Sequence, residues 1–333
     1  MGYIELFLLV QSHLPCVGRG KVRDSFLINH EGKRYRLVLT SDRISIFDFV
    51  LGFDIPRKGE VLNAINIFNM LLLARAHSDL LQDIVAYGPA MDSYLPPALR
   101  GNKELWTRAV LVEDLNVINV EGIRRWHLTG TGYATYLKTL KANGGEFGTL
   151  CGHRLPAGLR NGQLLDRCLF TPTTKAEEDH DVDLPVTVVG RDHPGFQLFT
   201  AKVGETLREH AASVGLILAD TKFEVSRRAD FRYVLVDERG TPDSSRFWGV
   251  DEYAECWPER LPKSLDKEAV RIVGRELNIH KRDPKIPRDR REVSEIEFPA
   301  DTISDTTRNY LALGEWYMTT PIETFKRDGM GIE

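Results

Sequence analysis

Short apolar runs separated by polar turns recur along the 333 residues, and their spacing predicts a mixture of strands and helices. Between residues 17 and 62 the runs VGRGKVRDSFLIN and RYRLVLTSDRISIFDFVLG, with EGK as the turn between them, are typical of β-strands. Apolar residues three or four positions apart predict helices over 61–82, 195–214 and 266–277. The pattern therefore favours an α+β protein whose N-terminal part is rich in strands.

Other segments carry less regular patterns. The Gly-rich stretch 138–168 and the charged stretch 280–295, which contains two prolines, are expected to be loops. Residues 106–120 predict a strand, a crossing between domains and a second strand. We place the domain boundary there, which gives a β-rich N-terminal domain over 1–114 and an α/β domain over 115–333.

The stretch from residue 215 to residue 248 combines apolar strands with regularly spaced charges. In GLILADTKFEV, the residues Asp220, Lys222 and Glu224 recur at every second position. Alternate side chains of a strand project from the same face, so two carboxylates and an ammonium form one row. A second apolar strand ends at Asp237 and Glu238, and the short connection between the strands predicts a hairpin.

A row of like charges on a buried strand needs a counter-charge. Buried carboxylates repel each other unless a cation lies between them, and a divalent metal bound to a phosphate-bearing ligand would supply it. The alternative is the solvated face of an amphipathic hairpin. The apolar run GLILA argues against that alternative, because it predicts a strand buried on both sides.

Composition limits the class of protein. A chain of 333 residues suits about two domains, and 42% hydrophobic with 28% charged residues is typical of a globular protein. A net charge of −4 and a pI near 6.2 argue against nucleic-acid binding by bulk charge. The four cysteines are scattered without a CxxC pair, which predicts reduced thiols in a cytoplasmic protein.

The first residues, MGYIELFLLV, include an apolar run. The run has no basic leader, no small-residue cleavage site and too few residues to span a membrane, so we expect a buried helix or strand. The sequence therefore predicts no membrane attachment.

One glycine-containing segment could contact phosphates. The chain has no GxxxxGK[ST] loop, and GRGKVR lacks the third glycine of a dinucleotide-binding turn. Gly18 and Gly20 nevertheless stand beside Lys21 and Arg23, two cations that alternate in strand register. Glycine allows close approach of the backbone to a phosphate, and the cations could neutralise it. The alternative is an ordinary basic β-turn.

Two further segments bring hydroxyl and charged groups together. In 170–183, FTPTTKAEEDHDVD, Lys175 stands close to several carboxylates, and the segment is either a substrate-contacting loop or a solvated charge run. His180 has no second histidine at metal-ligand spacing. In 241–248, TPDSSRFW, two hydroxyls and an arginine suit a phosphate monoester, and a Pro-Asp turn capped by serine is the alternative.

Eight segments occur in the order found in SAICAR synthetases, the purine-pathway enzymes also called phosphoribosylaminoimidazole-succinocarboxamide synthases: RGKVRD, TSDRISIFD, IPRKGEVL, LTGTGY, FTPTTKAE, GLILADTKFE, VDERGTPDSSRFW and SLDKEAVR. They span roughly residues 15–315, and the most specific are FTPTTKAE and ADTKFE…TPDSSRFW. On these motifs the chain is identified as a member of the family.

The resemblance implies a fold and an activity. SAICAR synthase-like proteins have a two-domain α+β fold, similar to ATP-grasp or kinase-like arrangements, with nucleotide between a β-rich N-terminal domain and a larger α/β domain. They join the carboxylate of carboxyaminoimidazole ribotide to the amine of L-aspartate and convert ATP into ADP and phosphate. The implied ligands are ATP, Mg²⁺ and small-molecule substrates, without nucleic acid or membrane.

The resemblance also assigns residues to the nucleotide and the metal. Lys21, Val22 and Arg23 would lie at the phosphates of ATP. Glu224 and Asp237 would hold Mg²⁺.

The remaining assignments concern the reacting groups. Lys222 and Asp220 would be catalytic, with Asp220 or Asp181 taking the proton of the attacking amine. Substrate contacts fall on six residues: Arg125, Thr131, Lys175, Asp181, Ser245 and Arg246. Arg246 is the best candidate for the ribotide phosphate, and Lys175 and Asp181 would lie near the carboxylate and amino-acid end.

Several residues differ from the family's usual ones near the presumed acceptor and amino-acid sites: Ala64, Asn66, Thr131, Tyr133, Val182, Asp183 and Pro185. These changes leave two alternatives, a SAICAR synthetase with altered loops or a paralogue that ligates a different heterocyclic carboxylate or amine in specialised nucleoside biosynthesis. A kinase that releases ADP without an amino acid is a third. A binding protein on the same scaffold is disfavoured, because Lys222, Glu224 and Asp237 are all present.

Overall fold

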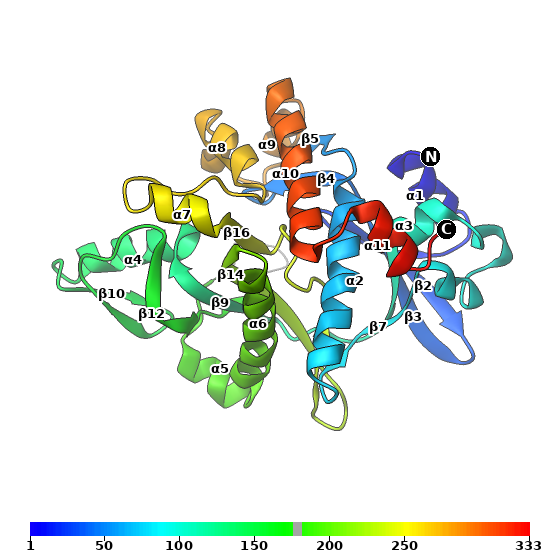
Figure 1. The fold of residues 1–333 in the computed structure, drawn as a ribbon, viewed down its shortest axis with the longest axis horizontal. Coiled ribbons are helices and arrows are strands. Elements are labelled where there is room, and N and C mark those ends of the chain that lie inside the picture. The colour runs from blue at the N-terminus through cyan, green and yellow to red at the C-terminus, as the bar shows by residue number, and fades with distance from the viewer. Residues whose placement is uncertain (176–181) are drawn as a thin grey trace. The chain divides into compact units, whose positions relative to one another are not determined.

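The computed structural model describes residues 1–175 and 182–333, which form two compact units (Figure 1). The first unit combines three segments of the chain: Met1–Leu72, Gln82–Leu115 and Leu265–Glu333. The second unit combines Leu73–Leu81 with Asn116–Ser264. The two units are described in turn.

The division differs from two consecutive domains. The change of unit after Leu115 falls where the sequence predicts a crossing, but residues 265–333 belong to the first unit. The physical reason is a shared apolar core, in which Val270 and Val293 from the C-terminal segment join Ile44 and Phe49.

A five-stranded antiparallel sheet forms the centre of the first unit. Its order is β1 (Cys16–Arg19), β2 (Arg23–His30), β3 (Lys33–Thr40), β8 (Ala109–Glu113) and β7 (Ile84–Tyr87). Phe26, Leu37 and Leu111 lie in the core on this sheet, together with Leu6 and Val10 of α1 (Tyr3–Gln11). The N-terminal apolar run is therefore a helix buried on one face, as its composition predicts.

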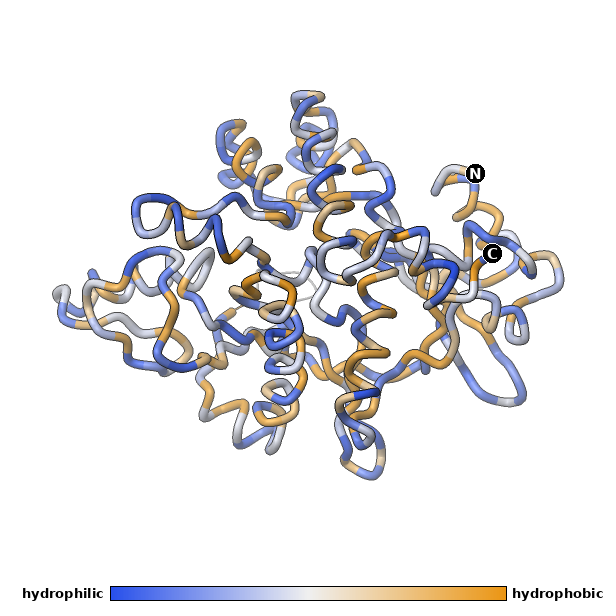
Figure 2. Tube along the Cα trace, viewed as in Figure 1, coloured by the Kyte–Doolittle hydropathy of each residue, from blue (hydrophilic) through white to orange (hydrophobic). Residues whose placement is uncertain are grey.

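Further elements complete the first unit. β4 (Arg43–Ile46) and β5 (Phe49–Asp54) form a separate hairpin. The helices are α2 (Lys58–Ala76), which belongs to this unit as far as Leu72, α3 (Lys103–Arg108), α8 (Glu268–Glu276), α9 (Pro287–Ser294), α10 (Ala300–Met318) and α11 (Ile322–Asp328), with 3₁₀ turns at Gly88–Ser93, Pro97–Leu99 and Ile279–Lys281. Figure 2 shows that α2 is apolar along most of its length, and Val61, Leu62, Ala64 and Ile67 are buried on different sides of it. A helix that is apolar all round is a core helix.

The second unit is built around β14 (Leu216–Arg227). Neighbouring strands follow the order β12 (Gln163–Phe170), β9 (Val120–Leu128), β14 and β15 (Tyr233–Val236), while β13 (Thr173–Thr174) pairs with β9 and β16 (Ser245–Gly249) pairs with β14. β6 (Leu81–Gln82) spans the point where the chain passes between units. The strand pairs of β14 with β9, β15 and β16 are all antiparallel.

Helices and a small hairpin surround this sheet. They are α4 (Gly130–Ala142), the hairpin of β10 (Phe147–Leu150) and β11 (His153–Pro156), α5 (Val186–Asp192), α6 (Phe196–Ser213) and α7 (Val250–Cys256). Phe196 of α6 packs in an apolar cluster with Phe170 and Val225 of the sheet. Tyr136 of α4 packs in a second cluster with Leu150 and Leu155 of the hairpin.

Most element predictions are confirmed. The strands of 17–62, the hairpin of β14 and β15, and helices α2, α6 and α8 lie where the apolar spacing places them. Two predictions are wrong. Residues 138–168 contain β10, β11 and part of β12, and residues 280–295 contain α9.

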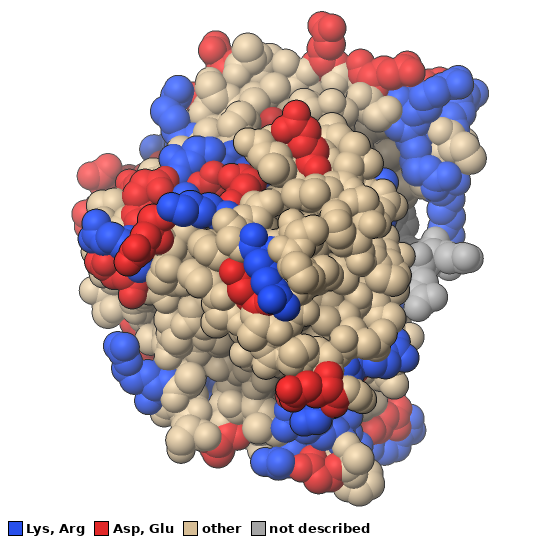
Figure 3. All heavy atoms as spheres, turned by 90° about the vertical axis from the view of Figure 1, so that its right-hand side faces the viewer, with Lys and Arg blue, Asp and Glu red and all other residues tan. Residues whose placement is uncertain are grey.

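Charged side chains of both signs stand beside one another on the face in Figure 3, separated by wide uncharged areas. This agrees with the small net charge of the chain. Among the residues that the structure describes, no helix combines the length and the apolar character needed to cross a membrane.

Candidate functional site

β14 carries the alternating charged row, and neighbouring strands hold it on both edges. β9 sets Arg125 opposite Asp220 and Ile123 opposite Lys222. On the other edge, β16 pairs with the first half of β14 and β15 with its second half. Between these two, the N–H of Lys222 donates to the carbonyl of Ser244 at 3.1 Å. The backbone of the row is therefore fixed along its whole length.

The two faces of β14 have different surroundings. Phe223 and Val225 are fully buried, and Val225 packs against Phe196 of α6. On the opposite face, Asp220 and Glu224 expose only 4% and 8% of their surface. The alternative of a solvated hairpin is therefore wrong, because both carboxylates of the row are buried and only Lys222 between them is partly exposed.

Asp220 joins two arginines from the two neighbouring strands. Nη1 of Arg125, on β9, donates to Oδ2 of Asp220 at 2.7 Å. Nη1 of Arg246, on β16, donates to the same oxygen at 2.5 Å. Two guanidinium groups thus share one carboxylate. Such a group attracts an anion, and guanidinium forks suit phosphate oxygens.

Hydroxyl groups fix and extend this cluster. Arg125 also donates from Nε to the hydroxyl of Thr171 at 2.9 Å and from Nη2 to that of Thr131 at 3.3 Å. Its complete burial lowers the pKa of its guanidinium. The hydroxyl of Ser245 lies 2.8 Å from that of Thr221. Thr131, predicted from the sequence, therefore belongs to the same site as the two arginines. Ser245 pairs with Thr221, on the face of β14 opposite to Asp220.

Lys222 pairs with a residue that the sequence did not reveal. Its Nζ donates to Oε1 of Glu121, on β9, at 2.5 Å, and Glu121 is 4% exposed. Burial, the largest single cause, would lower the pKa of Lys222, but the charge and hydrogen bond of Glu121 together with the charges of Glu224 and Glu238 outweigh it and raise this pKa above its ordinary value. Lys222 is therefore a fixed positive charge at neutral pH.

Glu224 lies at the far end of the row. Lys175 forms an ion pair with its carboxylate. Burial, followed by the nearby charge of Asp237, raises the pKa of Glu224 to about 7. The two carboxylates thus repel each other, which is the condition that a cation between them relieves.

Asp237 follows directly after the last residue of β15, where Val236 pairs with Glu224. Its φ of 57° lies in the left-handed region, which residues with a Cβ rarely adopt. This backbone turn ends the strand and sets the direction of the Asp237 side chain.

The glycine-containing segment lies in the first unit. Gly20 begins a tight turn in which its N–H donates to the carbonyl of Arg23 at 2.7 Å, and a Cβ on Gly20 would lie 2.8 Å from that oxygen. Lys21 pairs with Asp48, and the carbonyl of Val22 accepts from the N–H of Ser41 at 2.9 Å. Lys21, Val22 and Arg23 are thus held in one turn between β1 and β2.

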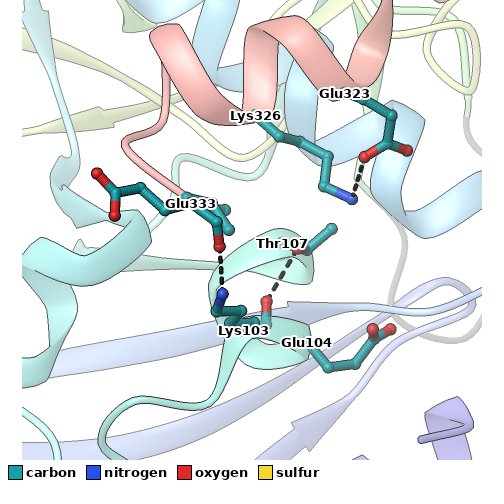
Figure 4. A pocket seen from close by; sticks show the side chains of 7 residues that line it. Lys103, Glu104, Thr107, Glu323, Lys326 and Glu333 are labelled. Carbon is teal, nitrogen blue, oxygen red and sulfur yellow. Dashed lines mark hydrogen bonds and ion pairs between the residues drawn. The ribbon is translucent and has the colours of Figure 1, made fainter.

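A cavity of about 240 Å³ opens elsewhere in the first unit (Figure 4). Its lining residues are Lys103, Glu104, Thr107, Glu323, Lys326, Ile332 and Glu333. Figure 4 shows Lys103 reaching the carbonyl of Glu333, and Lys326 pairs with Glu323 at 3.1 Å. None of the residues assigned from the sequence lines this cavity, and several of its charged groups pair with residues outside the lining, such as Glu104 with Arg108.

The structure thus brings together in the second unit seven of the assigned residues: Arg125, Thr131, Lys175, Asp220, Lys222, Glu224 and Arg246. Ser245 is not among them, because its hydroxyl lies at Thr221 on the other face of β14. Asp237 joins them through its charge on Glu224. Asp181 lies outside the described residues. Glu121 was missed, although its spacing of four residues from Arg125 on a strand places both on one face.

Comparison with known proteins identifies the family of this chain. The family model of SAICAR synthetase matches residues 16–285. The phosphoribosylaminoimidazole-succinocarboxamide synthase of Thioalkalivibrio sulfidiphilus is 34% identical over 311 residues, which cover 91% of this chain and 95% of that protein. The corresponding synthase of Mycolicibacterium vanbaalenii is 38% identical over 265 residues, covering 76% and 78%.

Solved structures give the same relation. The SAICAR synthase of Saccharomyces cerevisiae in complex with SAICAR superposes with a TM-score of 0.73 at 27% identity, covering 92% of this chain and 96% of that one. A SAICAR synthetase in complex with ADP superposes with a TM-score of 0.59 at 18% identity, covering 91% and 98%. The second of these likenesses concerns the fold alone.

Proposed function

The chain belongs to the SAICAR synthetase family, and we propose that it joins carboxyaminoimidazole ribotide to L-aspartate, with conversion of ATP into ADP and phosphate. The observation that carries the proposal is the buried row on β14. Asp220 is shared by Arg125 and Arg246 at one end of the row, and Glu224 lies at the other end, with Lys222 between them. An anion site and a pair of carboxylates are thus held on one strand face.

The reaction needs activation of a carboxylate, which is a poor electrophile. An oxygen of the ribotide carboxylate attacks the γ-phosphorus of ATP, and ADP leaves. The amine of aspartate then attacks the carbonyl carbon of the acyl phosphate, phosphate leaves and the amine loses a proton. Both steps depend mainly on positioning and on neutralising charge.

Arg125 and Arg246 are the residues that we assign to the ribotide phosphate. Their shared carboxylate holds them in one orientation, and two guanidinium forks at one place suit a phosphate group. Thr131 adds a hydroxyl group at the same place, and the substrate contact of Ser245 stays a prediction. Asp220 aligns the two arginines in this scheme, and its further role as acceptor of the amine proton stays a prediction shared with Asp181.

Lys222 supplies positive charge next to the reacting groups. Because Glu121 keeps it protonated, Lys222 can stabilise negative charge that develops during transfer, and it is not a proton acceptor. Lys175, paired with Glu224, is assigned to the carboxylate and amino-acid end.

Glu224 and Asp237 fit a magnesium ion. Mg²⁺ usually binds through one or two carboxylates together with substrate phosphates, and when bound here it would neutralise charge on the transferred group. Across residues 1–175 and 182–333, no cluster of three or more histidine, cysteine or acidic residues could hold a metal. A site completed by ATP therefore suits these two residues better than a metal cage made of protein alone.

The remaining assignments concern the nucleotide and the compartment. We place the phosphates of ATP at Lys21, Val22 and Arg23, where a glycine turn carries two cations. The cysteines Cys16, Cys151, Cys168 and Cys256 all carry free thiols, which supports a reducing compartment such as the cytoplasm.

The test is release of ADP by the purified protein in the presence of Mg²⁺. We expect release only when the ribotide and L-aspartate are both present, with equal amounts of ADP and SAICAR. If another amine supports ADP release and L-aspartate does not, the protein is a paralogue with a different substrate. If ADP is released without any amine, the protein is a kinase. Either of those results would overturn the proposal, and reactions that lack the ribotide or Mg²⁺ serve as controls.

A further inference from the structure

Arg239 is an arginine buried beside the end of β15. Its exposed fraction is 0%, and it lies two residues after Asp237. Nη1 of its guanidinium donates to the carbonyl of Asp237 at 2.9 Å, and Nη2 donates to the carbonyl of Leu235 at 3.3 Å. One rigid group therefore binds two carbonyls of the same strand end, on either side of Val236.

The backbone between these two carbonyls includes a conformation that is unfavourable by itself. Asp237 has a φ of 57°, whereas Val236 still pairs with Glu224 in the regular ladder. A residue with a Cβ in the left-handed region persists where its surroundings hold it there. Hydrogen bonds from a charged guanidinium are stronger than neutral ones, so Arg239 can hold this turn.

The turn at Asp237 determines how close its carboxylate lies to that of Glu224. Glu224 is fixed on β14, and Asp237 reaches it from the neighbouring strand. If the turn at Asp237 relaxed to extended backbone, the side chain would move to the other face, because alternate residues of a strand face opposite sides. The distance between the two carboxylates therefore depends on the turn.

We propose that Arg239 is a positioning residue, which locks the left-handed turn at Asp237 and so sets the spacing of the Glu224–Asp237 pair that binds Mg²⁺. The inference rests on the assignment of these two carboxylates to the metal under the proposed function. Arg239 itself touches neither substrate nor metal in this scheme. Its effect is on metal affinity.

The experiment compares two variants of the full-length protein. Arg239→Met keeps a long side chain but removes every donor, and Arg239→Lys keeps one charged donor group that cannot bridge two carbonyls as a fork. Binding of Mn²⁺ in the presence of ADP is measured by electron paramagnetic resonance. We expect a loss of affinity of about 10-fold or more for Arg239→Met, as for other residues that orient metal ligands, and a smaller loss for Arg239→Lys.

A matched control uses another buried arginine of the second unit. Arg124 is 6% exposed and lies 5.9 Å from the ring of Phe170, on the face of β9 opposite to Arg125. Arg124→Met removes a buried guanidinium without touching the β15 turn. It should leave the affinity for Mn²⁺ within about 2-fold of wild type, below the range expected for metal-orienting residues.

Steady-state kinetics give the second readout. In Arg239→Met the half-saturating concentration of Mg²⁺ should rise in proportion to the loss of Mn²⁺ affinity, with kcat at saturating Mg²⁺ much less affected. Unchanged Mn²⁺ affinity in both Arg239 variants would overturn the proposal. If Arg239→Met does not fold, the Mn²⁺ affinity of Arg239→Lys alone tests the proposal: a lower affinity than the wild type supports it, and an unchanged affinity overturns it. Mn²⁺ binding is independent of the ligase assay, so failure of the proposed function would show separately as absence of SAICAR formation by the wild type.

Discussion

At the scale of single residues, the carboxyl group of Glu224 gives the second unit a dependence on pH. Its pKa rises from 4.5 to about 7, first because it is buried and second because Asp237 is close. A raised pKa means that the folded state binds the proton more tightly than the unfolded state. The stability that protonation provides is therefore complete below pH 4.5 and is lost as the pH rises through about 7.

Glu224→Gln tests this dependence, because glutamine resembles the protonated acid at every pH. Without divalent metal, the variant should match the wild type at pH 5 and be more stable at pH 8, by on the order of 1–3 kcal/mol. Urea unfolding in EDTA at the two pH values measures the difference. A variant that is less stable than the wild type at pH 8 would contradict the account. The same variant should bind Mn²⁺ more weakly, since a ligand charge is lost.

The row on β14 could be predicted from the sequence because alternation on one strand needs no knowledge of neighbours. The partners of this row on other strands could not be predicted in this way. Glu121 meets Lys222 only through the register of β9 against β14, and a shift of one residue would place Glu121 on the other face. Arg239 has no periodic signal, and its bonds to the carbonyls of Leu235 and Asp237 depend on a turn that the spacing of residues does not reveal.

At the scale of elements, the back of the sheet is fitted to α6 by two glycines. A Cβ on Gly122 of β9 would lie 2.8 Å from Phe196 and 2.9 Å from Thr200, both on α6. A Cβ on Gly204 of α6 would lie 3.1 Å from Trp126, which is tight but not prohibitive. The strand that carries Glu121 and Arg125 therefore approaches the helix more closely than any side chain on Gly122 allows.

Gly122→Ala should destabilise the protein by about 1–3 kcal/mol, the usual cost of overpacking. Gly204→Ala is the matched variant, because its tighter packing is offset by the gain of up to about 1 kcal/mol from replacing a helical glycine. We expect it to stay within about 1 kcal/mol of the wild type. Urea unfolding compares the three proteins. Equal stability of Gly122→Ala and the wild type would show that the sheet can yield at this point.

Glycine also explains the strands that the sequence did not predict. Gly148 lies within β10, where a Cβ would be 2.3 Å from the ring of Tyr136, so this glycine serves packing and not a loop. Gly152, with a φ of 89°, makes the turn to β11. A Gly-rich stretch thus holds a hairpin, because some glycines permit turns and others permit close contact.

The helix α9 was missed for a different reason. Its sequence PRDRREVS offers almost no apolar periodicity, and Val293 is its one apolar residue in the core. Pro287 is nevertheless well placed at the first position of a helix. Gly52 of β5 lets the helix end approach, because a Cβ there would lie 1.8 Å from the carbonyl of Ser294. Tertiary contact of this kind is not visible in local sequence.

At the scale of the whole molecule, the C-terminal segment shows why linear order is a poor guide to units. Residues 265–333 complete the core around the β4–β5 hairpin, where Ile279 is fully buried with Ile44 and Phe49. A hydrophobic core can contain segments that are far apart in the sequence. A single boundary predicted from a change of sequence pattern therefore marks only one of the places where the chain passes between units.

Ile279→Ala tests this division of the chain. Removing a buried isoleucine side chain should cost about 2–5 kcal/mol, and the loss should fall on the first unit. In hydrogen exchange measured by mass spectrometry, peptides that cover β4 and β5 should exchange faster in the variant. Peptides that cover β9 and β14 should keep the rates of the wild type, because their core clusters do not include Ile279. Ile272→Ala, at a position that is 48% exposed on α8, is the control from the same segment and should change neither set. Equal acceleration of β14 and of β4–β5 in Ile279→Ala would show instead that the chain opens as one cooperative structure.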